Sequence, residues 1–253
     1  MSEVVGAPGR FLTAQWRDLL MLNFVVDPRL LAPHVPAGTV LDLWQGKAIV
    51  SVVGFRFVDT RLLGLPLPGH RNFEEVNLRF YVRRHEPAGV RRAVVFIREL
   101  VPRRAIAWVA RAWYNEPYRS LRMRHSVSAH GAERVVRYEW REGRVWTGLA
   151  ARTVGAASAL VPGSEAEFIT EHYWGYTRQR DGGTVEYQVA HPSWRVWAAH
   201  DATLSGDIAA TYGAAFAPAL AGAPRSAFVA EGSPITVYRP RRLSLAEHGA
   251  RNG

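Results

Sequence analysis

Two histidines, two glutamates and six aromatic residues surround one predicted hairpin between residues 171 and 197. Asp181-Gly182-Gly183 lies near its centre and supplies the positive φ angles that a tight hairpin needs. His172 lies just before the first predicted strand, and His191 lies just after the second one. Histidine is the side chain that most often transfers protons near neutral pH, so two converging histidines would support acid-base chemistry. The alternative is an ordinary hairpin whose aromatic residues form core and whose polar residues face water.

A second source of polar groups is the segment 73–84, FEEVNLRFYVRR, which has the strict alternation of a strand. One face is apolar and runs from Val76 to Val82. The other face carries Glu75, Asn77, Arg79 and Tyr81. If this face meets solvent, its mixed charges have no special meaning; if it lines the interior of a barrel, the same side chains converge in a pocket. The residues themselves leave both arrangements open.

The sequence contains none of the usual cofactor or metal motifs. It has no Gly-rich phosphate loop ending in Lys-Ser/Thr, no dinucleotide fingerprint after a strand and no Gly-x-Ser-x-Gly elbow. No two of the nine histidines have the helical spacing of a metal-binding pair. We therefore expect no cofactor and no metal ion, and we expect a small-molecule ligand or substrate as the partner.

Length and composition set the broad class. The 253 residues are 48% hydrophobic, and without a repeat or linker they predict a single domain over residues 1–253. The chain has no cysteine, which excludes a disulfide framework, a thiolate metal site and a cysteine nucleophile. Its start lacks a signal-peptide pattern and its longest apolar run, residues 19–26, is too short to cross a bilayer. The expected location is therefore the cytoplasm, with no membrane partner, and a homo-oligomer stays open.

The chain is strongly basic, with a net charge of +10 and a pI near 10.6. Such a charge is typical of nucleic-acid-binding proteins. However, of the 32 basic residues only Lys47 is a lysine, and the arginines are spread in pairs such as Arg83-Arg84 and Arg241-Arg242. No recognition motif accompanies them. A nucleic-acid partner is therefore the least favoured of the functions considered.

The order of elements begins with predicted helices and continues with strands. Thr13 is a candidate N-cap, and the apolar spacing between Leu12 and Leu20 predicts a first helix. Asp27-Pro28 predicts a second, short helix through Leu31. Further predictions are strands at 41–58 (with a turn at Gln45-Gly46), 92–100 and 105–113, and a hairpin at 138–147 that turns at Glu142-Gly143. A short helix that Ser164 and Glu167 cap and a helix at 205–220 follow.

Six strings in this order resemble the YqjF-like domain-of-unknown-function family over about residues 12–240. They are WRDLLMLNF, LDLWQGKA, FEEVNLRFYV, ARAWYNEPY, FITEHYWGYTRQRDGGTVEYQVAHPSW and AEGS. That family is similar to the acetoacetate-decarboxylase-like superfamily. The resemblance implies a mainly β (α+β) fold, a cone-shaped antiparallel β-barrel with a central cavity and a few peripheral helices. This agrees with the strand-rich pattern and favours a polar barrel interior for the segment 73–84.

The resemblance also implies which chemistry is missing. Decarboxylases of the superfamily use a buried lysine with a lowered pKa that forms a Schiff base with a ketone. Their motif resembles Gly-x-Pro-Lys-Lys and aligns here with residues 115–119, so that Tyr118 and Arg119 occupy the lysine positions. An arginine does not become a neutral nucleophile near neutral pH. The remaining lysine, Lys47, lies beside a predicted turn in a different strand.

The scaffold without this lysine leaves a candidate set of proton-transfer and anion-binding groups. The catalytic candidates are Glu75, Glu116, His172, Tyr176 and His191. The substrate-binding candidates are Arg79, Arg111, Tyr114 and Tyr118. We expect His172 and Tyr176 to face Glu75 and Arg111 across the pocket, with Trp174 and Tyr187 assigned to packing. The alternatives are that Arg111 only pairs with Glu116 or Glu99 and that His191 only fixes a strand end.

Three functions are compatible with these residues. The first is a lysine-independent enzyme that uses acid-base chemistry (enolisation, dehydration, cyclisation or hydrolysis) on a small carbonyl or carboxylate compound. The second is a small-molecule binding protein with the same cavity and no catalysis. The third is a nucleic-acid-binding protein. We prefer the first, because several complementary polar groups are costly to bury unless they are used.

Overall fold

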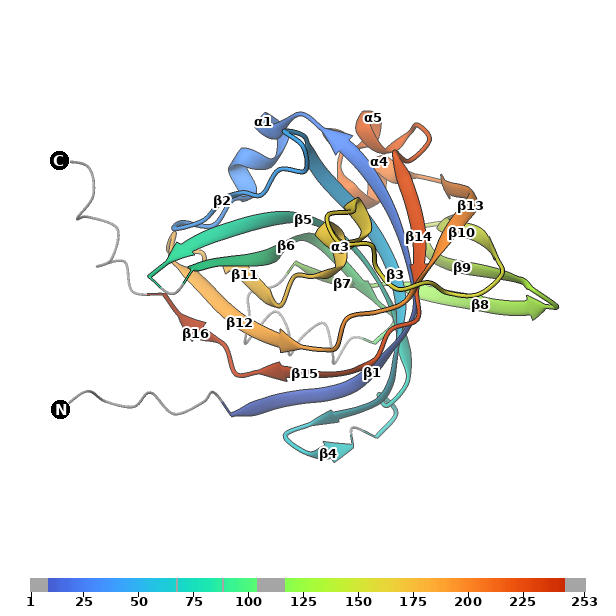
Figure 1. The fold of residues 1–253 in the computed structure, drawn as a ribbon, viewed down its shortest axis with the longest axis horizontal. Coiled ribbons are helices and arrows are strands. Elements are labelled where there is room, and N and C mark those ends of the chain that lie inside the picture. Colours follow the sequence, from blue (N-terminus) through green and yellow to red (C-terminus); the bar gives the residue numbers. More distant parts are fainter. Residues whose placement is uncertain (1–8, 67, 88, 104–116, 244–253) are drawn as a thin grey trace.

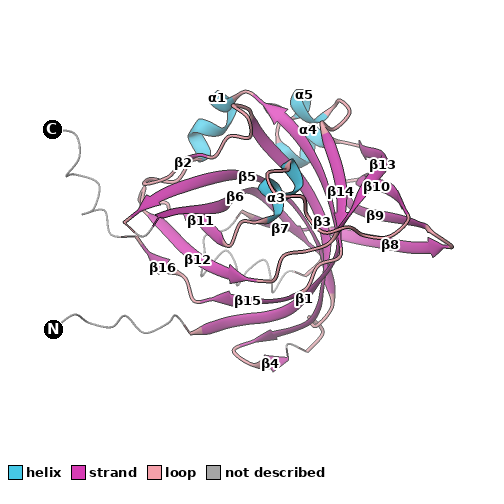
Figure 2. Cartoon of the chain, in the orientation of Figure 1, coloured by secondary structure: helices cyan, strands magenta, loops and turns pink. Residues whose placement is uncertain are grey.

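The computed structural model describes residues 9–66, 68–87, 89–103 and 117–243. Strands dominate this part of the chain and the helices are short, as Figure 2 shows. The helical elements are α1 (Pro28–Leu31), η1 (Ala32–His34), α3 (Glu165–Thr170), α4 (Ile208–Tyr212) and α5 (Ala217–Leu220). The strands are β1 (Arg10–Val26), β2 (Val40–Leu41), β3 (Ala48–Leu62), β4 (Leu65–Pro66), β5 (Phe73–Glu86), β6 (Gly89–Val101), β7 (Tyr118–Ser120), β8 (Arg122–His130), β9 (Glu133–Glu142), β10 (Val145–Val154), β11 (Trp174–Arg178), β12 (Thr184–Ala190), β13 (Val196–Ser205), β14 (Ser226–Ala230), β15 (Pro234–Tyr238) and β16 (Arg241–Arg242).

Hydrogen bonding closes part of the sheet into a ring. The order β3-β5-β6-β11-β12-β15-β1 returns to its start, because β1 also pairs with β3 along most of its length. These pairings are antiparallel except for the short contact of β6 with β11. The predicted mainly β fold is thereby confirmed, and Figure 1 shows the strands of the ring in the left and central part of the molecule. A closed ring has an inside, and this decides where the polar face of β5 points.

A second layer of strands continues from the same long strand. The C-terminal half of β1 pairs with β14, and β13, β10, β9 and β8 follow in that order and extend to one side in Figure 1. One apolar cluster lies on the inner face of the ring and includes Phe55, Phe73 and the α3 residue Phe168. A larger cluster, with Leu78 and Trp140, lies between the outer face of the ring and the second layer. Both faces of β3 and β5 are therefore buried.

The helix predicted between Thr13 and Leu20 is wrong, because this segment belongs to the 17-residue strand β1. A β-bulge at Asp18, whose φ is +54°, explains the helical spacing. Because of the inserted residue, Trp16 and Leu19 both point to the interior of the ring. Two apolar side chains three residues apart therefore share one face of a strand. The Asp18 backbone carbonyl accepts a hydrogen bond from the Tyr138 hydroxyl, and its carboxylate forms ion pairs with Arg56 and Arg134. These contacts hold the bulge in place.

Other local predictions have mixed outcomes. The Asp27 cap of α1 and the Ser164 cap of α3 are confirmed by hydrogen bonds from backbone N–H groups to their side chains. The hairpin around residues 181–183 is confirmed as β11 and β12. The helix predicted at 205–220 is wrong in extent: residues up to 205 continue β13, and Gly213, with φ of +92°, separates α4 from α5. The strand predicted at 105–113 lies outside the described residues.

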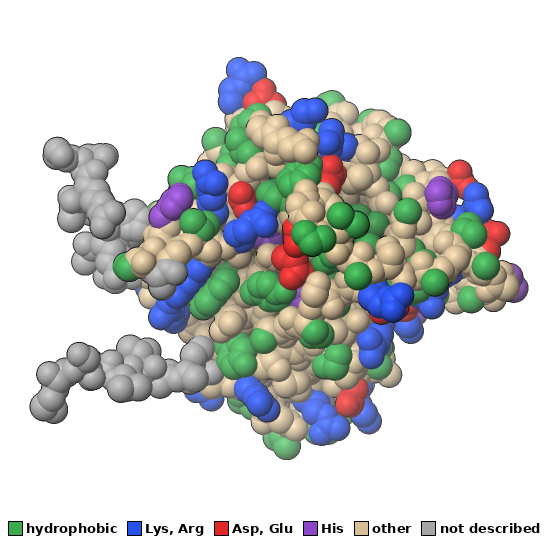
Figure 3. Space-filling model, in the orientation of Figure 1, with side chains coloured by type: hydrophobic (Ala, Val, Ile, Leu, Met, Phe, Trp, Pro, Cys, Tyr) green, Lys and Arg blue, Asp and Glu red, His purple; other side chains and the backbone are tan. Residues whose placement is uncertain are grey.

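Two further observations concern the surface and the membrane. On the face shown in Figure 3, the basic side chains are interspersed with acidic and apolar ones. None of the helices described by the structure has both the length and the apolar character that a membrane crossing requires.

Candidate functional site

The ring encloses a cavity of about 300 Å³, at the lower end of the size range of small-molecule sites. Most of its wall is apolar and aromatic. The apolar lining consists of Phe11, Leu12, Trp16, Leu19, Val53, Phe55, Phe57, Leu62, Phe73, Val94, Phe96, Trp174, Tyr187, Val189, Trp194 and Val237. The polar lining consists of Thr60, His70, Glu75, Asn77, Arg79, Glu99, Tyr118, Thr170, His172 and His191. A few polar groups in an apolar cavity are typical of a binding or active site.

Strand β5 supplies one polar wall through three alternate residues. Glu75, Asn77 and Arg79 all line the cavity and are 3%, 2% and 8% exposed. The neighbouring Glu74 points to the outside, where it lies 3.4 Å from His125. The parity that the sequence predicted for this strand is therefore confirmed, because the strand has no irregularity between Glu75 and Asn77.

Two hydrogen bonds orient the Glu75 carboxylate. Asn77 Nδ2 donates to Oε1 over 3.1 Å, and the Tyr118 hydroxyl donates to Oε2 over 3.0 Å. Tyr118 occupies one of the two positions that align with the decarboxylase lysines. The other, Arg119, points elsewhere and forms an ion pair of 2.6 Å with Glu142. The motif position therefore still contributes to the cavity, with a phenol in place of an amine.

Glu99 is a second buried carboxylate on the cavity wall, and the sequence considered it only as a partner of Arg111. Simple alternation from Val94 and Phe96 would place Arg98 inside and Glu99 outside. The register shifts here, since Arg79 pairs with Phe96 while Leu78 pairs with Arg98. This bulge at Ile97 turns Glu99 inward. Such an irregularity leaves no reliable signal in one sequence.

Arg79 has no carboxylate within ion-pair distance among the described residues. Its Nη2 atom donates to the Ile169 carbonyl over 3.3 Å and lies 3.7 Å from the Met21 sulfur. Its guanidinium also lies 5.7 Å from the centre of the Tyr81 ring. The Nε atom has no hydrogen-bond acceptor in the described part of the chain. Arg79 is thus a buried cation whose hydrogen-bonding capacity is incompletely used.

His172 follows α3 and is buried against the rings of Tyr81 and Phe168. Burial lowers the pKa of its imidazole to about 4; Asp42 opposes this shift, while Arg92 and Arg79 add to it. Its Nε2 atom lies 3.8 Å from Asp42 Oδ2, which is beyond hydrogen-bond distance, and neither ring nitrogen has a partner among the described residues. His172 is therefore a neutral imidazole with free hydrogen-bonding capacity near Arg79.

His191 lines another part of the wall within a group of aromatic rings. Its ring stacks on Trp194 at 4.2 Å and lies 4.8 Å from the Tyr173 ring. Burial lowers the pKa of His191, although its hydrogen bond with the Pro192 carbonyl and the nearby Glu171 oppose the shift. The two histidines of the hairpin thus reach the same cavity, and burial favours the neutral form of both.

The structure places Tyr176 on the outer face of the ring instead of in the cavity. Tyr176 pairs with Glu186, whereas its neighbour Gly175 pairs with Tyr187, whose ring occupies the space of a Cβ at residue 175. Tyr187 and Trp174, expected only to pack, line the cavity. Burial and the nearby Glu186 carboxylate raise the pKa of Tyr176 to about 12.

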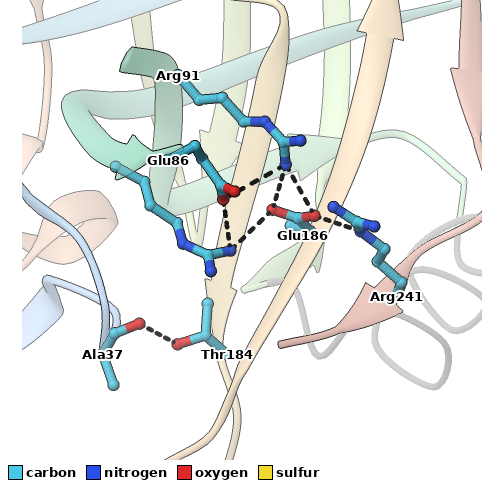
Figure 4. Close-up of polar contacts among 7 residues, drawn as sticks. Ala37, Glu86, Arg91, Thr184, Glu186 and Arg241 are labelled. Carbon is cyan, nitrogen blue, oxygen red and sulfur yellow. Dashed lines mark hydrogen bonds and ion pairs between the residues drawn. The ribbon is translucent and has the colours of Figure 1, made fainter. Parts of the chain in front are cut away.

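Glu186 belongs to a separate charged cluster on this outer face. Its carboxylate accepts hydrogen bonds from Arg91 and Arg241, and Glu86 lies beside them, as Figure 4 shows. We call Arg84, Glu86, Arg91, Glu186 and Arg241 the Glu186 cluster. It is a structural group in which three arginines share two carboxylates, and Tyr176 lies next to it.

Three predicted site residues, Arg111, Tyr114 and Glu116, lie outside the described residues. Lys47 is exposed beside the turn at Gln45-Gly46 and does not line the cavity. Among the described residues no group of three or more His, Asp or Glu side chains is arranged to hold a metal ion. What the cavity offers is an oriented carboxylate, a phenol, a buried guanidinium and two neutral imidazoles. These groups can accept and donate protons and bind an anion.

Comparisons with known proteins agree with this fold. The model of the DUF2071 family, described as an uncharacterized conserved protein, matches residues 13–234. The uncharacterized protein YqjF of Bacillus subtilis (strain 168) is 28% identical over 178 residues, which cover 70% of this chain and 72% of YqjF.

Among solved structures, acetoacetate decarboxylase from Legionella pneumophila subsp. pneumophila str. Philadelphia 1 matches with a TM-score of 0.66 and 12% identity, covering 96% of this chain and 93% of that one. An acetoacetate decarboxylase-like enzyme from Sphingomonas wittichii RW1 matches with a TM-score of 0.62 and 14% identity, covering 93% and 94%. The enduracididine biosynthesis enzyme MppR complexed with pyruvate matches with a TM-score of 0.62 and 13% identity, covering 96% and 93%. At these identities the likeness concerns the fold.

Proposed function

The chain belongs to the DUF2071 family, and we propose that it is an enzyme that performs lysine-independent acid-base chemistry on a small carbonyl or carboxylate compound. The observation that carries this proposal is the Glu75 carboxylate, which Asn77 and Tyr118 orient inside an apolar cavity. A carboxylate held in a dry site by specific donors is well placed to remove a proton from a carbon acid. Enolisation is the simplest reaction of this kind.

Each polar group has a separate role in the proposed reaction. Glu75 is the general base, and the Tyr118 hydroxyl fixes its orientation by donating to Oε2. Arg79 binds the anionic part of the substrate. His172 and His191 stay neutral and donate or accept hydrogen bonds at the opposite side of the substrate. The pyruvate bound to MppR supports small carbonyl compounds as substrates here.

A Schiff-base mechanism is not part of the proposal. The only lysine of the chain, Lys47, is exposed and lies away from the cavity lining. Borohydride treatment in the presence of a bound ketone should therefore leave the protein mass unchanged. A reduced adduct on Lys47 that requires the cavity would contradict this expectation.

The proposal is tested by hydrogen exchange in D2O. A panel of small 2-oxo acids, 3-oxo acids and ketones is incubated with the protein, and the loss of the α-proton signals is followed by ¹H NMR. Glu75→Gln should slow the exchange by at least about 100-fold, because a general base typically contributes this much. Tyr118→Phe should slow it by about 10-fold, in line with the loss of one hydrogen bond to a charged group.

Tyr176→Phe is the matched control, because it removes a phenol hydroxyl from the outer face and should leave the exchange rate unchanged. Exchange at the wild-type rate in Glu75→Gln would remove Glu75 from the mechanism. If the wild-type protein binds a panel member intact and exchanges none, a small-molecule binding protein replaces the enzyme as the better interpretation.

A further inference from the structure

The charge of the cavity lining restricts the ligand. Arg79 is its only arginine or lysine among the described residues, and burial lowers the pKa of both His172 and His191. The described lining also holds two carboxylic acid side chains, Glu75 and Glu99. The part of the cavity next to Arg79 therefore favours a negative charge on the ligand.

The unused hydrogen-bond donors of the Arg79 guanidinium indicate which chemical group it binds. A buried guanidinium without an anion is costly, because its solvation is lost and no partner replaces it. Arg79 is 8% exposed, and in the described part of the chain its only polar contacts are the Ile169 carbonyl at 3.3 Å and the Met21 sulfur at 3.7 Å. A carboxylate accepts two parallel hydrogen bonds from a guanidinium, which matches the donors that are unused here.

The remaining walls indicate the body of the ligand. Apolar and aromatic side chains form most of the lining, with rings such as Phe55, Phe57, Phe96, Trp16 and Tyr187 among them. The phenylalanine rings offer no hydrogen bonds, and the tryptophan and tyrosine rings offer one polar group each. This wall therefore suits hydrocarbon and aromatic groups better than a polyhydroxylated compound. A volume of about 300 Å³ suits one ring or a short chain.

We propose that the cavity binds apolar monocarboxylates, whose carboxylate pairs with Arg79 and whose aromatic or hydrocarbon body lies among the ring side chains. This assignment names the substrate class and rests on the proposed function only in using the same cavity. Short acids without a body and neutral analogues are disfavoured.

Isothermal titration calorimetry with three matched probes tests the assignment on the full chain. The probes are 3-phenylpropanoate, its amide 3-phenylpropanamide, and acetate, which has the carboxylate without the body. We expect 3-phenylpropanoate to bind at least 10-fold more tightly than either of the other two. Equal binding of the acid and the amide, or no binding of the acid, would overturn the assignment.

Variants connect the preference with Arg79. Arg79→Gln should remove the acid-over-amide preference and leave the affinity for the amide unchanged. Arg79→Lys retains the positive charge and should keep part of the preference, which also shows that a variant at this position folds. Arg98→Gln is the control, since Arg98 is half-buried on β6 but does not line the cavity. If Arg79→Gln retains the preference, Arg79 is not the anchor.

One neutral probe separates this assignment from the proposed function. The ketone 4-phenyl-2-butanone has the same type of body and exchangeable α-protons but no carboxylate. Exchange of this ketone in D2O without any acid-over-amide preference overturns the assignment and leaves the enzymatic function in place. An acid-over-amide preference without exchange of any carbonyl compound supports the assignment and contradicts the enzymatic function.

Discussion

Two arginines of the same strand, Arg79 and Arg84, are almost equally buried, at 8% and 7% exposed, but have different surroundings. Arg84 Nη1 lies 3.0 Å from Glu86 Oε1 and 3.6 Å from Glu186 Oε2. Arg79 has no such carboxylate among the described residues. The fold thus pairs the buried cation on the outer face of the ring with carboxylates, whereas the described residues supply no counter-ion to the one inside the cavity. A residue that was buried only for stability would not need this difference.

The Glu186 cluster has its own structural purpose. Glu186 is fully buried and accepts from both Arg91 and Arg241. Arg91 also lies 4.2 Å above the ring of Trp174, which lines the cavity. The cluster therefore holds β5, β6, β12 and β16 together behind the aromatic wall, as the converging side chains in Figure 4 show. Removal of its central carboxylate should affect stability more than any change at Arg79.

The largest expected effect is therefore that of Glu186→Gln, which leaves the surrounding arginines without their shared carboxylate. We expect a loss of about 3–5 kcal/mol in the free energy of unfolding, measured by urea denaturation at pH 7. Glu133→Gln, which weakens a more exposed pair of 3.8 Å with Arg152, is the control and should change little. A loss below about 1 kcal/mol for Glu186→Gln would mean that the cluster does not need its centre.

An intermediate effect is expected on the pH dependence of stability, because His172 near Arg79 is buried. In the unfolded chain a histidine titrates near pH 6.5, whereas burial lowers the pKa of His172 in the folded protein to about 4. Between these values the unfolded state binds more protons, so stability falls as the pH is lowered from about 6.5 to about 4, by up to about 3 kcal/mol. Urea denaturation across this pH range should show a shallower dependence for His172→Gln than for the wild type. Parallel curves for the two proteins would show that His172 is not buried in the neutral form.

The smallest effect on stability is expected for Arg79→Met, which removes a buried cation that has no carboxylate partner in the described part of the chain. Its free energy of unfolding should stay the same or rise by about 1–2 kcal/mol in ligand-free buffer, while the binding of 3-phenylpropanoate is lost. Urea denaturation and calorimetry of the same preparation measure both quantities. A destabilisation above about 2 kcal/mol would instead assign Arg79 a structural role and weaken the contrast with Arg84.

Several parts of the site were predictable from the sequence, because they depend on local alternation. The polar face Glu75, Asn77 and Arg79 lies on a regular stretch of β5, so a period of two was enough to group them. The Asp-Gly-Gly turn likewise fixed the hairpin that brings His172 and His191 to one cavity. The absence of a Schiff-base lysine at residues 118 and 119 was also evident from the sequence, since Lys47 is the single lysine of the chain.

Other features were decided by the tertiary structure. The bulge at Asp18 gave a strand the spacing of a helix, and the bulge at Ile97 brought Glu99 inside. Ring closure determined that Tyr187 faces inward and Tyr176 outward. By itself the sequence determined the family, the strand-rich character and most of the polar residues, because these follow from motifs and from neighbours along the chain. Only the tertiary structure decided which of them share the cavity and which buried arginine has carboxylate partners, because bulges, register and ion pairs depend on residues that are distant in sequence.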